Sequence, residues 1–241
     1  MRRLVPLFSI LLTASPALGA PVLLEDTREL SVYAQAFDAK GEGDPVGPVI
    51  LSRSAPGAFF AEQRAVSANA PGFGATAVAG AIQFTQFHDA PGLDFSGDGA
   101  AEVQVDLLDP LGGADAIAQT TVRLVFQLFE DTRYDLGGQL TLFSLGDVSS
   151  EARVSLRAAT AAESVFERST SGAFGSSGVL EEGVWVFELV ATAQSAAVLP
   201  NPFESSNAVA SFREVRFVLV PAPGAATAMV VIAALSARRR R

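Results

Sequence analysis

Apolar and polar residues alternate in many short stretches between about residue 21 and residue 220. From Val122 to Leu128 every even position is apolar, while Arg123 and Gln127 fall on the opposite face. A period of two is typical of a half-buried β-strand, because successive side chains of a strand point to opposite sides of the sheet. This pattern predicts strands over Leu30–Ala36, Ala77–Phe87, Glu102–Leu108, Thr121–Glu130, Gln139–Leu145, Ala152–Ala158, Ser164–Glu167, Val184–Ala193 and Phe212–Val220.

Turn-forming residues interrupt these stretches at short intervals. Val179 to Trp185 predicts a hairpin, and the glycine-, proline- and acid-rich range Asp38 to Pro48 predicts an exposed loop. The range Ala158 to Arg168 is ambiguous between helix and strand. The clearest turn signals are Gly137-Gly138, Ser171-Gly172, Gly175 to Gly178 and Glu182-Gly183.

About ten short strands without interleaved helices indicate an all-β fold, an antiparallel β-sandwich of jelly-roll-like type. We expect residues 20–220 to form one such domain.

The first residues follow a different pattern, in which charge and hydrophobicity are segregated. Arg2 and Arg3 are basic, Leu4 to Thr13 is an apolar run interrupted by Pro6, and small residues follow. Ala17 and Gly19 fit the small-x-small rule for signal cleavage. We therefore expect residues 1–19 to be a signal peptide and the protein to be exported.

The C-terminal end is also segregated. Pro221-Ala222-Pro223 precedes an uncharged run from Ala225 to Ala237, and Arg238, Arg239, Arg240 and Arg241 follow. As a helix this run is ~20 Å long, against a hydrocarbon core of ~30 Å, so it predicts a short and marginal transmembrane helix. Clustered arginines favour the cytoplasmic side and can snorkel toward it.

In this order and spacing, residues 221–241 resemble the sorting tail of the PEP-CTERM proteins of Gram-negative and related bacteria, although Ala222 stands where that family usually has glutamate. The resemblance implies recognition near Pro221 and Pro223 by an exosortase-like processing enzyme and removal of a tail that anchors the protein transiently in the membrane. It also implies delivery to the cell surface or to an exopolysaccharide matrix. An ordinary tail anchor that stays in the membrane is the alternative.

Charge and cysteine content narrow the class of protein. Six of the 17 basic residues lie in the two ends, which leaves 11 basic and 26 acidic residues between them, a formal charge of −15. Such a domain repels phosphate backbones, so nucleic acid is not an expected partner. The chain has no cysteine, which excludes disulfides, thiolate zinc sites and cysteine nucleophiles.

One segment has the spacing of a calcium loop. Asp94, Ser96, Asp98 and Glu102 occupy positions 1, 3, 5 and 9 of such a loop, and a glycine follows at position 6. Calcium takes several oxygen ligands, and the glycine allows the sharp turn that gathers them. The usual acid at position 12 is replaced by Val105, and a simple Asp/Gly-rich turn is the alternative.

Candidate catalytic residues are few. His88-Asp89 provides half of a triad, but the chain lacks the Gly-x-Ser-x-Gly elbow that positions a serine. The acids Glu102, Glu130, Asp131, Glu181 and Glu182 form no pair at a defined separation. Trp185 lies in a strand that is apolar on both faces, so we expect it in the core, and Tyr134 is a candidate to tie a corner through its hydroxyl.

The leading hypothesis is a non-enzymatic exported protein of the cell surface or extracellular matrix, without a cofactor. A carbohydrate- or calcium-dependent binding module is the first alternative, and an extracellular hydrolase is the second.

Overall fold

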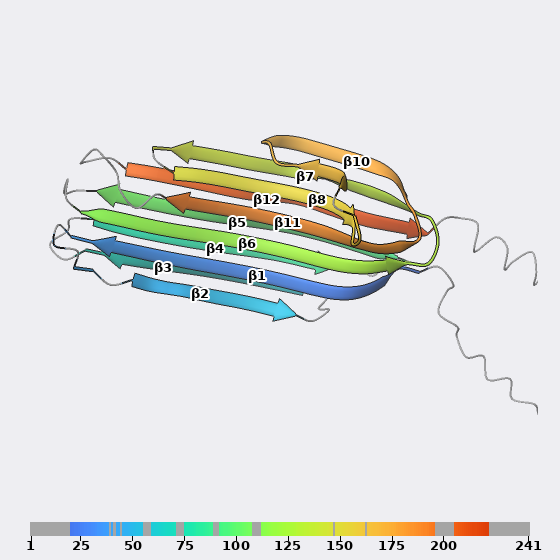
Figure 1. The fold of residues 1–241 in the computed structure, drawn as a ribbon, viewed down its shortest axis with the longest axis horizontal. Coiled ribbons are helices and arrows are strands. Elements are labelled where there is room, and N and C mark those ends of the chain that lie inside the picture. The colour runs from blue at the N-terminus through green and yellow to red at the C-terminus, as the bar shows by residue number, and fades with distance from the viewer. Residues whose placement is uncertain are drawn as a thin grey trace, which may run out of the picture.

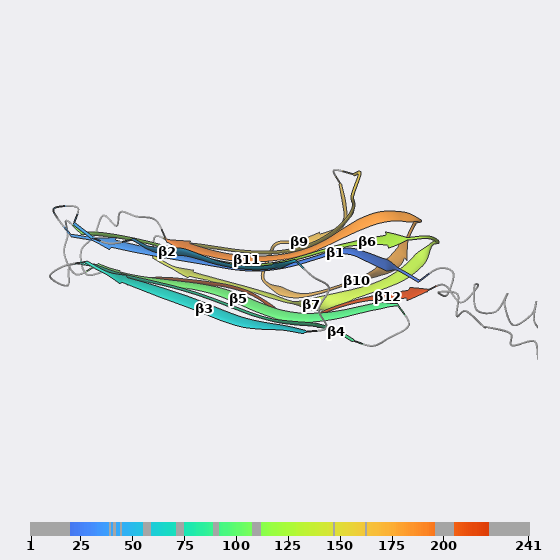
Figure 2. The same cartoon turned by 90° about the horizontal axis from the view of Figure 1, so that it is seen from below.

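The computed structural model describes residues 20–221 except residues 39, 41, 44, 55–58, 71–74, 89–91, 108–111, 147, 162 and 196–204. Within these described residues the chain forms twelve β-strands in two antiparallel sheets of six, and it contains no helix. The sheets pack face to face as two layers (Figures 1 and 2). The expected all-β antiparallel sandwich is therefore confirmed.

The two sheets are named here by their strand order. Sheet 1 consists, from edge to edge, of β2 (Pro45–Ser54), β1 (Val22–Phe37), β6 (Gly113–Leu128), β11 (Gly183–Ser195), β8 (Val148–Ala158) and β9 (Ser164–Arg168). Sheet 2 consists of β10 (Gly172–Leu180), β7 (Thr132–Leu145), β12 (Ser205–Pro221), β5 (Leu93–Leu107), β4 (Ala75–Phe87) and β3 (Phe59–Asn69).

Strands β5 to β12 pair in a nested order. β8 pairs with β9, β7 with β10, β6 with β11 and β5 with β12, and successive pairs alternate between the sheets. This is the connectivity of a jelly roll, in which a long antiparallel ribbon of chain wraps into two sheets. Strands β1 and β2 extend sheet 1 beside β6, and β4 and β3 extend sheet 2 beside β5.

Each range predicted as a strand lies wholly or mostly in a strand, but the alternation did not predict β2, β3 and β10. β2 is an edge strand, where proline is tolerated because no neighbour needs its missing N–H. The expected loop over Asp38 to Pro48 is therefore wrong from Pro45 onward. β10 is an edge strand built largely of glycine, serine and alanine, so its composition resembles a turn. The ambiguous range Ala158 to Arg168 includes the end of β8 and all of β9 rather than a helix.

Three predicted turns are also corrected, of which Gly175 to Gly178 lies inside β10. Gly137 and Gly138 lie inside β7, where a side chain on Gly138 would come within 2.9 Å of the Phe174 ring and 3.0 Å of the Val215 backbone. The range Val179 to Trp185 is not a hairpin, because β10 belongs to sheet 2 and β11 to sheet 1. The chain crosses between the sheets at this point.

The interior between the sheets has two different halves. One half is filled by large side chains, among them Phe95, Phe126, Phe187, Phe212 and Phe217. The other half is lined mainly by alanines from β1, β4, β5 and β6, with a few valines and leucines. Small side chains can fill an interior without voids only where the two sheets lie close together.

A buried ion pair lies between these halves. Asp26 and Arg28 on β1 are only 3% and 2% exposed, and Arg28 Nη2 lies 2.8 Å from Asp26 Oδ2. Arg28 also crosses to sheet 2, where it donates to the Thr85 carbonyl at 3.2 Å and lies over the Phe87 ring, 5.2 Å from its centroid. This side chain therefore joins the two sheets.

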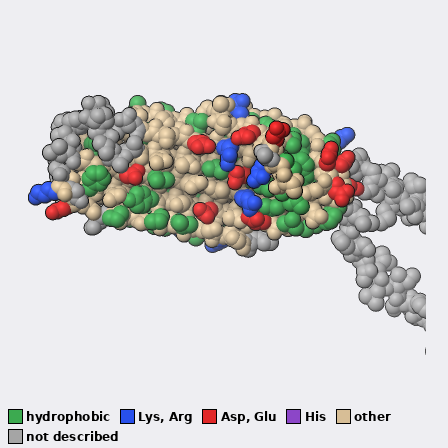
Figure 3. Space-filling view, viewed as in Figure 1, with side chains coloured by type: hydrophobic (Ala, Val, Ile, Leu, Met, Phe, Trp, Pro, Cys, Tyr) green, Lys and Arg blue, Asp and Glu red, His purple; other side chains and the backbone are tan. Residues whose placement is uncertain are grey.

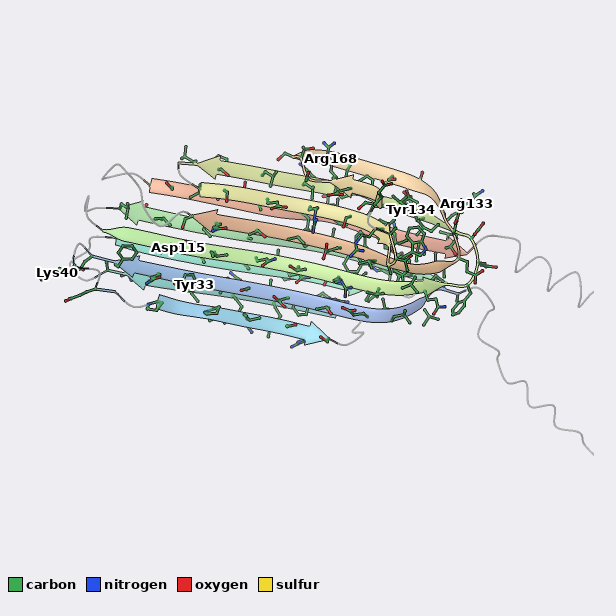
Figure 4. All side chains as sticks on the ribbon, viewed as in Figure 1. Tyr33, Lys40, Asp115, Arg133, Tyr134 and Arg168 are labelled. Carbon is green, nitrogen blue, oxygen red and sulfur yellow. The ribbon has the colours of Figure 1, made fainter. Side chains whose placement is uncertain are left out.

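Both described chain ends lie at one end of the sandwich, which we call the terminal pole. Val22 pairs with Gln127 and Pro221 pairs with Thr132, so both flank the β6–β7 turn (right in Figure 1). Arg133 and Tyr134 lie toward this pole, whereas Tyr33, Lys40 and Asp115 lie toward the opposite, distal pole (Figure 4).

The segments predicted as a signal peptide and as a membrane-directed tail, residues 1–19 and the chain beyond Pro221, lie outside the described residues. Within residues 20–221, as far as they are described, there is no helix that is long and apolar enough to span a bilayer.

Removing the cation of the buried pair should destabilise the fold. Arg28→Ala leaves the Asp26 carboxylate buried without its partner, which typically costs about 3–5 kcal/mol in the free energy of unfolding. Urea denaturation of the purified protein measures this value. The matched control is Arg153→Ala, which breaks the partly exposed pair with Glu188 and should change the free energy by less than about 1 kcal/mol. Equal effects of the two variants would contradict a special role for the buried pair.

Candidate functional site

The candidate site is a hollow on the outer face of sheet 2, over β3, β4 and β5. Residues in register form two rows across these strands. In the first row, Phe59 of β3 lies beside Gln86 of β4, which lies beside Ser96 of β5. In the second row, Ala61 of β3 lies beside Phe84 of β4, which lies beside Asp98 of β5. Members of a row lie side by side on one face of a sheet.

The hollow has a volume of about 240 Å³ and is only partly enclosed. Its walls include two exposed aromatic rings, because the side chains of Phe59 and Phe84 are 61% and 46% exposed. The residues that line it are Phe59, Phe84, Thr85, Gln86, Ser96, Gly97 and Asp98. Aromatic walls combined with a few polar groups are typical of binding pockets.

Three polar side chains form a connected group at this place. The Nε2 of His88 and the Oγ of Ser96 are 2.9 Å apart, and the amide nitrogen of Gln86 lies 3.2 Å from each ring nitrogen of His88. A serine–histidine contact of this length also occurs in catalytic triads, but a triad needs in addition a carboxylate that orients the histidine. Asp89, the carboxylate that the sequence offers, lies outside the described residues.

Asp94, next to this group, is bound to Arg216. Arg216 donates through Nε to Asp94 Oδ1 at 3.2 Å and through Nη2 to Oδ2 at 2.8 Å. These hydrogen bonds hold the pKa of Asp94 below its ordinary value of 3.8; burial opposes the shift, and the charges of Arg216 and His88 add to it. Both oxygens of Asp94 therefore serve the link between β5 and β12.

Asp98 fixes an irregularity in β12 beside the hollow. The register between β12 and β5 shifts between Phe212 and Val215, and Glu214 has a left-handed φ of 51°. Asp98 Oδ1 accepts a hydrogen bond from the Glu214 N–H at 2.6 Å. β-bulges re-aim side chains and occur often beside functional sites.

The predicted calcium loop is not a loop in the structure. Asp94, Ser96, Asp98 and Glu102 all lie in the continuous strand β5. A strand rises about 3.3 Å per residue, so the eight steps from Asp94 to Glu102 cover roughly 26 Å, and these oxygens cannot surround one ion. Among the described residues there is no group of three or more acids or histidines arranged to hold a metal.

A second hollow of about 460 Å³ lies beside Trp185 near the terminal pole. Trp185 is 8% exposed within the aromatic half of the core, and its Nε1 donates to the Glu181 carbonyl at 3.0 Å. The core position expected for Trp185 is therefore confirmed. The two acids of this hollow, Glu181 and Glu182, are neighbours on one turn, whereas glycoside hydrolysis needs carboxylates on opposite sides of the scissile bond.

The remaining candidates are placed as follows. The Tyr134 hydroxyl lies 2.9 Å from Ser176 Oγ, so it links β7 to β10 within sheet 2 instead of tying a corner. Pro221 is the last residue of β12. Pro223 and the arginines Arg238, Arg239, Arg240 and Arg241 lie outside the described residues.

The sequence singled out Ser96 and Asp98 as calcium ligands and His88 as a member of a catalytic triad, but not as parts of one site. It missed Phe59, Phe84 and Gln86 as site residues. The pattern did contain one usable signal, because Phe84 and Gln86 occupy the polar-facing positions of β4, where an exposed phenylalanine is unexpected. Strand β3 was not predicted, so its Phe59 could not be placed beside them.

The comparisons with known proteins give no assignment. No family model matches the chain, and no curated protein matches it. Solved structures that match include the VP2 subviral particle of infectious bursal disease virus, which is 11% identical and has a TM-score of 0.18, with 93% of this chain and 75% of that chain covered. The structure of the Gt strain of that virus is 10% identical with a TM-score of 0.19, covering 88% and 69%. At these scores the likeness carries no argument about function.

The Asp94–Arg216 pair should make stability depend on pH in acid. A carboxylate whose pKa is lowered by folding adds stability above its unfolded pKa, and this stability is lost as the pH falls through the folded value. The coupling between Asp94→Asn and Arg216→Gln, measured by urea denaturation of both single variants and the double variant, should be favourable at pH 6 and smaller near pH 2, because protonation of Asp94 removes its charge. The same coupling at both pH values would show that the pair does not depend on ionised Asp94.

Proposed function

We propose that this protein is a non-enzymatic exported protein of the cell surface or extracellular matrix, and that its C-terminal tail is processed by an exosortase-like enzyme. The β-sandwich is the part that the cell displays. The tail holds it to the membrane until processing.

The position of the chain ends is the observation that carries this proposal. The described chain begins at Ala20 and ends at Pro221, both beside the β6–β7 turn of the terminal pole (Figure 1). A signal sequence before Ala20 and an anchor after Pro221 therefore attach at one end of the elongated sandwich. The outer faces of both sheets and the distal pole stay accessible while the tail is in the membrane.

The start of the tail sequence fits a processing site. β12 ends at Pro221, and Pro223 follows two residues later. Proline lacks the N–H that a strand or helix would use, so this sequence disfavours regular structure directly after the sandwich. An enzyme that cleaves here needs such an extended peptide at the membrane surface.

The charge of the sandwich supports a displayed protein. Acidic and basic side chains are intermixed over the face of sheet 1, and acids gather at the terminal pole (Figure 3). The ion pairs Glu25–Arg123 and Arg153–Glu188 belong to this sheet. A net negative domain stays soluble and does not adsorb to anionic lipid.

The tail should be necessary for release. In the native host, an antibody against the sandwich should detect a form without the tail at the cell surface or in the medium. Replacing Arg238, Arg239, Arg240 and Arg241 by glutamine, or Pro221 and Pro223 by alanine, should leave the tail attached and the protein with the membranes. Fractionation and mass spectrometry of the C-terminus measure both outcomes.

The matched control is Arg213→Gln, which removes an exposed cation from the sandwich and should leave processing unchanged. If the tail variants are released at the normal rate, the proposal that an enzyme processes the tail is wrong. If the wild-type protein is found in the cytosol with both ends uncut, the proposal of export is wrong as well.

A further inference from the structure

We infer that the hollow on sheet 2 binds a segment of a neutral polysaccharide. This inference rests on the proposed function, because a surface or matrix location brings the protein into contact with polysaccharide. The binding itself depends on the folded sandwich alone.

The aromatic rings provide the first argument. Phe59 and Phe84 are 61% and 46% exposed at the hollow, although burial of each ring in the core would be favourable. They lie on adjacent strands in diagonal positions, since Phe59 pairs with Gln86, two residues beyond Phe84. The face of an aromatic ring is electron-rich and attracts the C–H groups on one face of a sugar ring. Two phenylalanine rings at neighbouring positions can therefore contact two successive sugar units of a chain and not only one sugar unit.

The polar groups provide the second argument. Sugar hydroxyls both donate and accept hydrogen bonds, so a site for them needs groups of both kinds. Gln86 offers an amide that donates and accepts, Ser96 offers a hydroxyl, and the carboxylate of Asp98 accepts several hydrogen bonds, of which the Glu214 N–H takes one. The contacts of His88 with Gln86 and Ser96 hold these side chains in place before a ligand arrives.

The rigidity of the site provides the third argument. Its residues sit on strands instead of loops, and its floor includes Thr85 and Gly97. From the interior, Arg28 donates to the Thr85 carbonyl, so the buried ion pair supports the floor from beneath. A preformed site loses little conformational entropy on binding.

Charge selects the class of polysaccharide. Asp98 places a carboxylate in the hollow, and the nearby cation Arg216 is already bound to Asp94. The sequence between the two ends carries a formal charge of −15. An anionic polysaccharide would be repelled by this field, so a neutral one fits.

Affinity electrophoresis of the purified full-length protein, with the neutral polysaccharides β-glucan and galactomannan and the anionic polysaccharide alginate in the gel, tests the inference. We expect at least one of the neutral polysaccharides to retard the protein and alginate not to retard it. Phe84→Ala and Phe59→Ala should each weaken the association about tenfold, as the loss of one ring contact implies. Asp98→Asn should weaken it as well.

The matched control is Phe143→Ala, which removes a phenylalanine that is 51% exposed on β7 of the same sheet but outside the hollow. It should bind as the wild type does. Ser96→Ala provides a second variant of the hollow, and the melting temperature of each variant confirms that it is folded.

Failure of both neutral polysaccharides to retard the wild type overturns the inference. If the wild type and the Phe84→Ala variant are retarded equally, this hollow is not the binding site. If alginate binds in a salt-sensitive way, the inference that the ligand is a neutral polysaccharide is wrong. None of these results bears on tail processing, which is measured by fractionation in cells, so the two proposals fail separately.

Discussion

The contact that the rest of the structure depends on is the passage of Arg28 from one sheet to the other. A sandwich of two sheets is held together mainly by apolar side chains, whose complementary packing favours one well-ordered arrangement of the sheets. Arg28 is held by Asp26 on its own strand, and it reaches the Thr85 carbonyl and the Phe87 ring of sheet 2. Because a buried charge must keep its partners, this one side chain constrains the position of β1 relative to β4.

The same contact marks the change in the core. On β1, Asp26 and Arg28 precede Leu30 and Val32, which belong to the alanine-rich half, and on β4 the polar residues Gln83 and Thr85 follow the alanines. Gly97 and Gly99 lie opposite them on β5. A side chain on Gly97 would come within 2.8 Å of Thr85 Cγ2, so the absence of Cβ at this position is required by the packing. The outer hollow lies directly over this part of sheet 2, where the backbone is fixed from inside.

The proposed display and the proposed binding make compatible demands on this fold. An attachment through the terminal pole would leave the broad faces of the sandwich free, and the hollow lies on one of these faces, formed by β3, β4 and β5. The bulge in β12 and its hydrogen bond from Glu214 to Asp98 hold one wall of the hollow, and the Asp94–Arg216 pair binds the same two strands together. A protein tethered at its end can thus present a rigid polar and aromatic surface sideways to a matrix.

The sequence by itself determined the fold class, because the alternation in segments such as Val122 to Leu128 is imposed by the pleat of a strand and does not depend on the rest of the chain. It also determined the segregated composition of both ends and the core position of Trp185. It did not determine the edge strands, since β2 and β10 are stabilised by pairing with β1 and β7 and not by their own composition. Nor could the spacing of Asp94, Ser96, Asp98 and Glu102 distinguish a turn from a strand, because glycines at 97 and 99 suit a turn as well as the crowded interior under Thr85 and Phe212. The assembly of the candidate site was decided by tertiary structure: Phe59, Phe84 and Asp98 lie on three different strands, and only the register of β3, β4 and β5 places them around one hollow.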